Sequence, residues 1–427
     1  MANNLAKIAV FWDQSFLWGL IAFDTLRRLR VDFKLLAAAD VRLGRLQDFD
    51  IVFVPGGWAS DKMEALGKDG ARQIRSFVEA GGGYLGVCGG AGLALTHASG
   101  LGLAHLGRLP STVRVPSFSG LIHLNLKEKT HPLWHGVPGG SAFYAWWPGQ
   151  FALNENHPVR ILASYGKPEA GASYVTDIPV TADADWNRWE KSYGINLNPA
   201  RLKNEPAVIE TGAGSGKVLL SYLHFETPAD PRGHEVLLNA LRYLSAGKQA
   251  ARGATPSGPA PGGKLSGDPK PEQNPAAAIA AEIHQLISGL IEFGCLNFLW
   301  RWRTRPILQW RRGVRGIEYS TLFAMTDKIS QLTAQFPDSS SAGLGRLQAL
   351  REMTLSFTAD ARRLLMLERF AINNGPLSPL KSSDPAILPL REKLFSSSRR
   401  CGGLYKQIVD TANEILLPLL RRELKDG

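Results

Sequence analysis

The chain has 427 residues, and 44% of them are hydrophobic, which is enough to build the cores of two or three domains. Three cysteines without local spacing argue against both a disulfide framework and a structural zinc site. The formal net charge is +11, and much of the excess lies in residues 275–427, which hold 21 Lys and Arg against 14 Asp and Glu. This asymmetry favours either an acidic partner or simply well-solvated helices.

The first part of the chain alternates short apolar runs with longer amphipathic stretches. This alternation predicts βαβ units around a parallel sheet, whose ligands bind beyond the carboxyl ends of the strands. The chain enters its first strand without a charged-then-apolar leader, so we expect a cytoplasmic protein. The expected strands cover residues 8–13, 31–36, 51–54 and 84–87, and the expected helices cover residues 15–30 and 70–80.

A pair of glycines occurs one residue after each of two expected strands. The first strand of the two is followed by Pro55-Gly56-Gly57-Trp58, and a backbone N–H exposed there can contribute to an oxyanion hole. The second strand leads into Cys88-Gly89-Gly90 and then an Ala/Leu-rich helix. A reactive residue on such a tight strand-to-helix turn is typical of a nucleophile elbow. The helix N-terminus behind Cys88 favours a thiolate and a developing oxyanion.

A base for this cysteine occurs far downstream in the chain. A run from Lys217 is expected to form a strand that carries His224, with Glu226 two residues later on the same side of the extended chain. Cysteine, histidine and an orienting carboxylate form the general set for covalent acyl chemistry. The alternative is that Cys88 is a small buried apolar residue and His224 a satisfied core histidine.

These motifs carry a resemblance to a known group of proteins. Pro55-Gly56-Gly57, Gly86-Val87-Cys88-Gly89-Gly90 and His224-Phe225-Glu226 occur in an order that resembles the class I glutamine amidotransferase-like superfamily. Residues 77–88 are most similar to the biotin-protein ligase N-terminal domain family, and the resemblance covers residues 5–246. It implies a flavodoxin-like, mostly parallel sheet with helices on both faces.

The resemblance also implies roles for individual residues. Cys88 would be the nucleophile, His224 its base and Glu226 the orienting acid, with N–H groups near Gly57 and Gly89 forming the oxyanion hole. Two departures stand out: Gly89-Gly90 fits only loosely the small residue and glycine usual after the cysteine, and Phe225 replaces a usual proline. No ligase motif of the Gly-Arg-Gly-Arg or Lys-Trp-Pro-Asn-Asp type follows, so we do not expect biotin ligase activity.

Shorter β-like segments are expected after residue 110. They include an aromatic run from Phe143 to Phe151, in which Tyr144 and Trp146 either form a wall that stacks a flat substrate group or pack a loop on the sheet. Residues 183–193, with Trp186 and Trp189 among charges, resemble a surface insertion or lid. Residues 235–244 are expected to close the domain as a helix.

Residues 247–275 are rich in Gly and Pro and poor in apolar side chains, which predicts a flexible linker. Beyond them, apolar residues recur with a helical period and predict a bundle of four or five antiparallel helices over residues 276–427, one of them around residues 310–336. Residues 277–299 are apolar enough to resemble a membrane span, but Glu282 and Glu292 interrupt them, so we expect a bundle helix and no transmembrane segment. The expected domains are therefore 1–246, the linker 247–275 and 276–427.

Aromatic and basic side chains alternate at Trp300-Arg301-Trp302-Arg303-Thr304-Arg305 and continue to Arg312. This pattern fits nucleic-acid binding, a membrane interface or Arg–Trp packing. We place packing or a protein interface first, because no nucleic-acid motif accompanies the patch.

Two functions from different classes remain open. The first is a Cys88–His224–Glu226 hydrolase or amidotransferase acting on an amide C–N bond of a small or peptide-like substrate, with Gly56, Gly57, Gly89, Trp58, Tyr144 and Trp146 lining the site and no cofactor or metal. The second is a non-catalytic binding or scaffold protein with a degenerate amidotransferase-like domain. In either case we expect residues 276–427 to bind a protein partner or self-associate.

Overall fold

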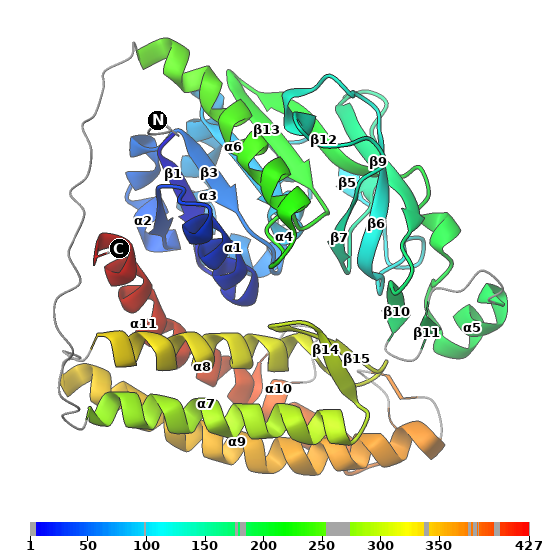
Figure 1. Ribbon diagram of the computed structural model, residues 1–427, viewed down its shortest axis with the longest axis vertical. Coiled ribbons are helices and arrows are strands. Elements are labelled where there is room, and N and C mark those ends of the chain that lie inside the picture. Colours follow the sequence, from blue (N-terminus) through cyan, green and yellow to red (C-terminus); the bar gives the residue numbers. More distant parts are fainter. Residues whose placement is uncertain are drawn as a thin grey trace. The chain divides into compact units, whose positions relative to one another are not determined.

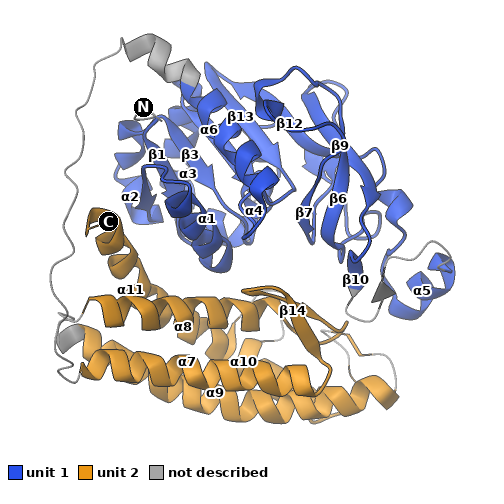
Figure 2. Ribbon diagram, in the orientation of Figure 1, with its two compact units in different colours: residues 1–174, 178–259 blue, residues 175–177, 260–427 orange. Residues whose placement is uncertain are grey.

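The computed structural model describes residues 6–97, 100–175, 178–179, 185–252, 274–336, 341–374, 377–378, 382, 384–396 and 402–426. The chain divides into two compact units, which Figure 2 shows in blue and orange. The first unit comprises residues 1–174 and 178–259, and the second residues 175–177 and 260–427. Most of the expected linker lies outside the described residues, so the domain boundaries derived from the sequence stay a prediction.

The first unit is built on an 11-stranded sheet in the order β11-β10-β6-β9-β12-β13-β4-β3-β1-β2, with β7 paired to β6 (Figure 1). The neighbouring strands β13, β4, β3, β1 and β2 pair in parallel, as the βαβ pattern predicts. Their side chains are almost all buried, because parallel strands are covered on both faces. Their bounds are β1 Ile8–Phe11, β2 Phe33–Leu36, β3 Ile51–Val54, β4 Gly83–Val87 and β13 Gly216–Ser221.

The other half of this sheet is antiparallel, and β12 joins the two halves by pairing antiparallel to β13. Strands β6, β9 and β12 are eight or nine residues long, longer than the short segments expected after residue 110. Strands β5 and β8 form a separate two-stranded pair. The bounds are β5 Gly107–Arg108, β6 Ser119–Leu126, β7 Ala142–Trp146, β8 Phe151–Ala152, β9 Arg160–Pro168, β10 Ser173–Val175, β11 Ile178–Pro179 and β12 Pro206–Ala213.

Helices cover both faces of the parallel strands. A Cβ added at Gly83 of β4 would meet Leu244, whereas the hydroxyl of Tyr84 donates to the carbonyl oxygen of Gly90 at 2.7 Å. Successive residues of a strand face opposite sides, so α6, which carries Leu244, and α4, which carries Gly90, lie on opposite faces. The helices of this unit are α1 Phe16–Arg28, α2 Ala38–Arg42, α3 Ala59–Glu79, α4 Gly89–Ala94, α5 Trp186–Tyr193 and α6 Pro231–Arg252.

Helix α3 begins at Ala59, well before the helix expected from residue 70. Its first part is mostly polar, and Gly67 has a non-helical conformation with a φ of 62°, so two helical segments meet there. The helical recurrence of apolar residues, from which this helix was expected, therefore begins only after Gly67. The early start brings the first turns of α3 beside the Gly56-Gly57 turn.

The second unit contains the helices α7 to α11 (Figure 1). Apolar side chains of these helices form its core. In α9, for example, Leu347, Leu350, Phe357, Leu364 and Leu365 recur with a helical period and are all buried, as the sequence pattern predicts. One correction concerns residues 300–310, which form a hairpin, so that the helix expected from residue 310 begins at Ile317. The bounds are α7 Pro275–Leu296, β14 Trp300–Thr304, β15 Ile307–Trp310, α8 Ile317–Gln335, α9 Ser341–Asn374, α10 Ile387–Phe395 and α11 Gly403–Asp426.

Within the described part of the chain, α7 is the helix long and apolar enough to cross a membrane by length and composition alone. It packs on α8 and α9, and its buried residues include Ile283, Ile287 and Leu290. Its Glu282 pairs with Arg351 of α9 at 2.6 Å. These contacts are those of a bundle helix, and a single apolar helix of this kind is weak evidence for a membrane span.

Candidate active site

Cys88 lies at the turn between β4 and α4, at the carboxyl edge of the parallel strands. Its backbone has φ 51° and ψ −105°, a conformation that L-residues adopt rarely and that clusters at functional sites. Its N–H donates to the carbonyl oxygen of Ser221 at 2.8 Å, which fixes the turn to the end of β13. Cys88 is half-buried.

The glycines beside Cys88 allow two loops to touch through their backbones. A Cβ added at Gly89 would overlap the carbonyl oxygen of Gly57, and one at Gly90 would overlap that of Val54. Gly57 itself has a φ of 116°, which only glycine adopts without strain. The turn after β3 and the start of α4 are therefore in direct contact, as the predicted oxyanion hole requires.

His224 and Glu226 are both fully buried, and the His224 Nδ1 atom lies 2.8 Å from Glu226 Oε1. The sequence-based expectation that a strand carries His224 is wrong in detail, because β13 ends at Ser221. A turn brings the two side chains together instead: the N–H and the hydroxyl of Thr227 donate to the His224 carbonyl oxygen at 3.1 and 2.8 Å. The carboxylate fixes which imidazole nitrogen faces it and leaves Nε2 for another partner.

The pKa of His224 reflects three neighbouring effects. Burial alone would lower this pKa, but the charges of Glu226 and Cys88, together with the hydrogen bond to Glu226, raise it to about 10. Among the described residues, none forms a hydrogen bond to the Nε2 atom of His224. The charge of Cys88 acts on His224, so the thiol lies within electrostatic range of the imidazole.

Trp18 of α1 covers the imidazole, a contact that the sequence reading missed. The ring centroids of Trp18 and His224 are 4.1 Å apart, with 33° between their planes. A Cβ added at Gly56 would lie 2.7 Å from the Trp18 ring, so the indole lies against both the glycine turn and the histidine. The glycine at position 56 thus makes room for this tryptophan.

Lys62 of α3 is a second residue that the sequence reading missed. Its side chain is completely buried, and its Nζ donates to the Ser15 hydroxyl, which donates to the Phe11 carbonyl oxygen at 2.9 Å. Burial lowers the pKa of Lys62 to about 7, against the opposing charges of Asp13 and Cys88. A lysine that titrates near neutral pH therefore lies within electrostatic range of Cys88.

The aromatic residues predicted to line the site differ in their exposure to solvent. Trp146 is buried, stacks on Tyr144 with ring centroids 5.1 Å apart, and donates its indole N–H to the Thr227 hydroxyl at 3.0 Å. Tyr144 is half-buried and its carbonyl oxygen accepts the N–H of His224 at 2.9 Å. Trp58 is 53% exposed. Tyr144 and Trp146 thus support the loop around His224, and their contact with substrate stays a prediction, as does that of Trp58.

No group of three or more His, Cys, Asp or Glu side chains suited to a metal ion occurs in the part of the chain that the structure describes. The groups that the candidate site brings together are a thiol, an imidazole, a carboxylate and backbone N–H groups of the chain itself.

One family model matches a segment of the first unit. Residues 47–98 match the family described as "Biotin-protein ligase, N terminal", and this segment contains both glycine turns and Cys88. The resemblance inferred from the sequence is thus confirmed for this segment. No curated protein matches the chain.

Several solved structures resemble the chain weakly. A putative GMP synthase subunit from Thermoplasma acidophilum is 16% identical, covers 59% of this chain and 100% of its own, and has a TM-score of 0.37. PurLQS from Thermotoga maritima is 15% identical over 56% of this chain and 99% of its own, with a TM-score of 0.37. A beta-galactosidase from Bacillus circulans sp. alkalophilus is 13% identical over 56% of this chain and 31% of its own, with a TM-score of 0.33. Likenesses this weak carry no argument about activity.

Proposed function

We propose that the first unit is a cysteine-dependent hydrolase or amidotransferase that cleaves an amide C–N bond through a thioester on Cys88. The observation that carries this proposal is the fully buried His224–Glu226 pair, whose free imidazole nitrogen is within electrostatic range of the half-buried thiol. A structural histidine has no need of a buried carboxylate on one nitrogen and an unpaired second nitrogen beside a strained cysteine.

In the first step, the Cys88 thiolate attacks the carbonyl carbon of the amide and forms a C–S bond. The carbonyl π-electrons move to oxygen, where backbone N–H groups near Gly57 and Gly89 would stabilise the negative charge. When the oxyanion collapses, the C–N bond breaks and the imidazolium of His224 gives its proton to the leaving nitrogen. The products of this step are an amine or ammonia and a thioester on Cys88.

In the second step, neutral His224 accepts a proton from a water molecule or an acceptor amine as that molecule attacks the thioester. The C–S bond breaks, the acyl group leaves as an acid or a new amide, and the Cys88 thiolate and the His224 imidazolium are restored. Glu226 would orient the imidazole and stabilise the imidazolium through its hydrogen bond to Nδ1. Gly56 would act through its contact with Trp18, and Trp58, Tyr144 and Trp146 would line the approach to the sulfur.

The proposal is tested by measuring ammonia release from a panel of primary amides. The wild-type protein is expected to release ammonia from at least one amide. Cys88→Ala should lose this activity, whereas Cys295→Ala, which removes a cysteine of the second unit, should keep it. Equal activity in Cys88→Ala and wild type would contradict the proposed nucleophile.

A non-catalytic role of the second unit is proposed beside this reaction, namely binding of a protein partner or a second copy of the chain in the cytoplasm. The end of α7 and the residues after it support this role, because Leu296 is 78% and Phe298 is 73% exposed, and Arg301 is exposed as well. The hairpin over residues 300–310 fits the Arg–Trp packing interpretation of its sequence. Its Arg305 guanidinium lies 5.2 Å from the centroid of the Trp302 ring. Sedimentation of the full chain should show association that Phe298→Ser weakens, and a monomer that binds no protein would exclude this role.

A further inference from the structure

A group of arginine and tyrosine side chains adjoins Cys88 and has no part in the reaction proposed above. Tyr222 follows the last residue of β13, Ser221, which pairs with Val87 and accepts the Cys88 N–H at 2.8 Å. Tyr222 therefore lies next to the nucleophile turn. Its side chain is only 2% exposed, and its hydroxyl makes no hydrogen bond to any of the described residues.

The turn at Pro148-Gly149 brings Arg114 to the same place. Arg114 Nη1 donates to the carbonyl oxygen of Pro148 at 3.4 Å, and a Cβ added at Gly149 would overlap the ring of Tyr222. The hydroxyl of Tyr165 donates to the Gly149 carbonyl oxygen at 3.1 Å. Arg114, Tyr165 and Tyr222 thus meet at one turn.

Arg114 also has a polar group without a partner. Its Nε is buried and makes no hydrogen bond within the described ranges of the chain, as is the case for the Tyr222 hydroxyl. Burial and the charge of Arg108 lower the pKa of Arg114, whereas the charges of Tyr222 and Cys88 oppose this shift. The Arg114 Nε and the Tyr222 hydroxyl are thus two buried donors without an acceptor among the described residues. Since buried polar groups in folded proteins are nearly always hydrogen-bonded, a bound ligand could supply the acceptor.

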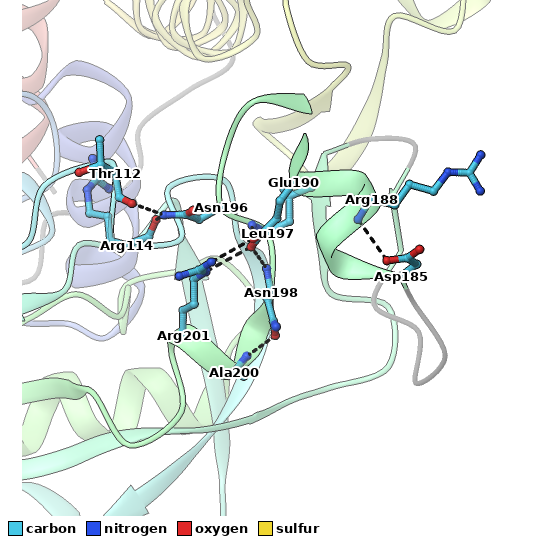
Figure 3. Close-up of polar contacts among 10 residues, drawn as sticks. All are labelled: Thr112, Arg114, Asp185, Arg188, Glu190, Asn196, Leu197, Asn198, Ala200 and Arg201. Atoms are coloured by element: carbon cyan, nitrogen blue, oxygen red, sulfur yellow. Dashed lines mark hydrogen bonds and ion pairs between the residues drawn. The ribbon is translucent and has the colours of Figure 1, made fainter. Parts of the chain in front are cut away.

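The loop that carries Arg114 is held in place, as Figure 3 shows. Asn196, just beyond α5, donates from Nδ2 to the carbonyl oxygens of Thr112 and Arg114 at 2.9 and 3.1 Å (Figure 3). Glu190 of α5 in turn accepts the N–H groups of Leu197 and Asn198 at 2.8 and 2.9 Å. This network fixes the backbone of Arg114, while the Pro148 carbonyl oxygen accepts from its guanidinium.

We propose that Arg114 and Tyr222 form a carboxylate-binding subsite, so that the preferred substrate carries an acidic group next to the amide that Cys88 attacks. A planar guanidinium binds a carboxylate through two parallel hydrogen bonds, and a tyrosine hydroxyl supplies a third donor. This inference rests on the proposed function of Cys88, and it adds the substrate class.

The test compares alkylation of Cys88 by iodoacetate, which is a carboxylate, with alkylation by neutral iodoacetamide. Stabilisation of the thiolate accelerates both reagents, so the ratio of the two rates reports only recognition of the carboxylate. Cys295 in the same protein gives the reference ratio. We expect the ratio at Cys88 to exceed that at Cys295 by about tenfold, the effect of one charge-assisted hydrogen bond.

The variants separate the subsite from its surroundings. Arg114→Met should bring the ratio at Cys88 to the Cys295 value, and Arg114→Lys should restore part of the preference. Tyr222→Phe should lower the ratio by a smaller factor, and it removes only a hydroxyl without a partner, so the fold is expected to tolerate it. Arg188→Met, which removes an exposed arginine of α5, is the matched control and should leave the ratio unchanged.

Three results would overturn the inference. Equal ratios at Cys88 and Cys295 in the wild type would exclude the carboxylate subsite while leaving Cys88 as a nucleophile. A preference that folded Arg114→Met and Tyr222→Phe both retain would also exclude it, because the preference would then come from other groups. Resistance of Cys88 to iodoacetamide would instead overturn the proposed function itself and, with it, the subsite.

Discussion

The indole of Trp18 lies against the imidazole of His224, with 4.1 Å between the ring centroids. The tryptophan is 6% exposed and touches the Gly56 turn on the way to the histidine. It therefore links α1, the turn after β3 and the loop after β13. This contact and the hydrogen bond to Glu226 both constrain the plane of the imidazole.

Replacing Trp18 should affect both stability and the reactive thiol. Trp18→Ala is expected to lower the free energy of unfolding by about 3–5 kcal/mol, as for other large-to-small core substitutions. It should also slow iodoacetamide alkylation of Cys88, because the imidazole loses one of its two supports. Trp18→Phe keeps an aromatic ring and should recover most of both quantities in urea unfolding and alkylation experiments. An Ala variant that unfolds earlier but alkylates Cys88 at the wild-type rate would limit Trp18 to packing.

Glu226 should control the charge of His224. Its carboxylate, together with Cys88, raises the pKa of His224 to about 10, so the imidazolium is the main form at neutral pH. Glu226→Gln keeps the shape but removes the charge, and the pKa of His224 should fall. We expect alkylation of Cys88 at pH 7 to slow by roughly tenfold or more, by analogy with other triads that lose their acid. A pH profile of the rate that is the same in Glu226→Gln and the wild type would contradict the pair.

Lys62 should make stability depend on pH in the alkaline range. Its pKa is lowered from 10.5 to about 7 by burial, so the unfolded chain binds more protons than the native state between these values. Below about pH 7 the buried charge destabilises the native state, and this penalty disappears as the pH rises from 7 to 10.5. Lys62→Met should raise the free energy of unfolding at pH 6 by about 1–4 kcal/mol and remove this rise with pH.

The matched control for Lys62 is Lys68→Met, which changes an exposed lysine of the same helix. It should move the free energy of unfolding little at any pH. If Lys62→Met destabilised the protein at pH 6, the ammonium group would be worth more to the fold than its burial costs.

The second unit depends on a buried ion pair. Arg391 of α10 contacts Glu368 of α9 at 2.6 Å, both side chains are at most 5% exposed, and the guanidinium also donates to the carbonyl oxygen of Gly313 at 2.7 Å. Arg391→Met leaves the carboxyl group buried without its partner and should destabilise this unit by about 3–5 kcal/mol. The double variant Arg391→Met/Glu368→Met should recover most of this loss in thermal unfolding.

The pH dependence of the Arg391→Met variant follows from Glu368. Burial raises the pKa of Glu368 to about 7 even against the charge of Arg391, and loss of the arginine should raise it further. A carboxyl group with a raised pKa in the native state loses stability as the pH rises from its unfolded pKa through its folded one. The variant should therefore be closest to the wild type near pH 5 and furthest from it at pH 8. A constant difference across this range would exclude Glu368 as the cause.

The sequence predicts the parallel half of the first unit and the identity of the candidate triad. Short apolar runs that end in glycines determine both the strands and the turns that carry Gly57 and Cys88. The residue types predict His224 and Glu226 as partners. They do not predict the turn that joins the two, because apolar residues flank His224 in the sequence whether the chain there is extended or turned. Their catalytic roles stay a prediction.

Other parts of the site depend on contacts between distant segments. Trp18 lies in an apolar helix whose sequence does not single it out, and Lys62 lies in a polar stretch where lysine is normally exposed. Arg114 belongs to a loop without any periodic pattern. At residues 300–304 a signal did exist, since tryptophan and arginine alternate with the period of a strand, and the hairpin follows this pattern.

The central claim, that Cys88 carries an acyl group during turnover, is tested most directly by intact-protein mass spectrometry. The protein is mixed with an amide substrate from the ammonia-release panel, quenched in acid after a short time, and digested to locate any added acyl mass. The account predicts a thioester on the peptide that contains Cys88, less of it in His224→Ala, and none in Cys88→Ala. Turnover without added mass on Cys88, or the same acyl mass on Cys88→Ala, would contradict it.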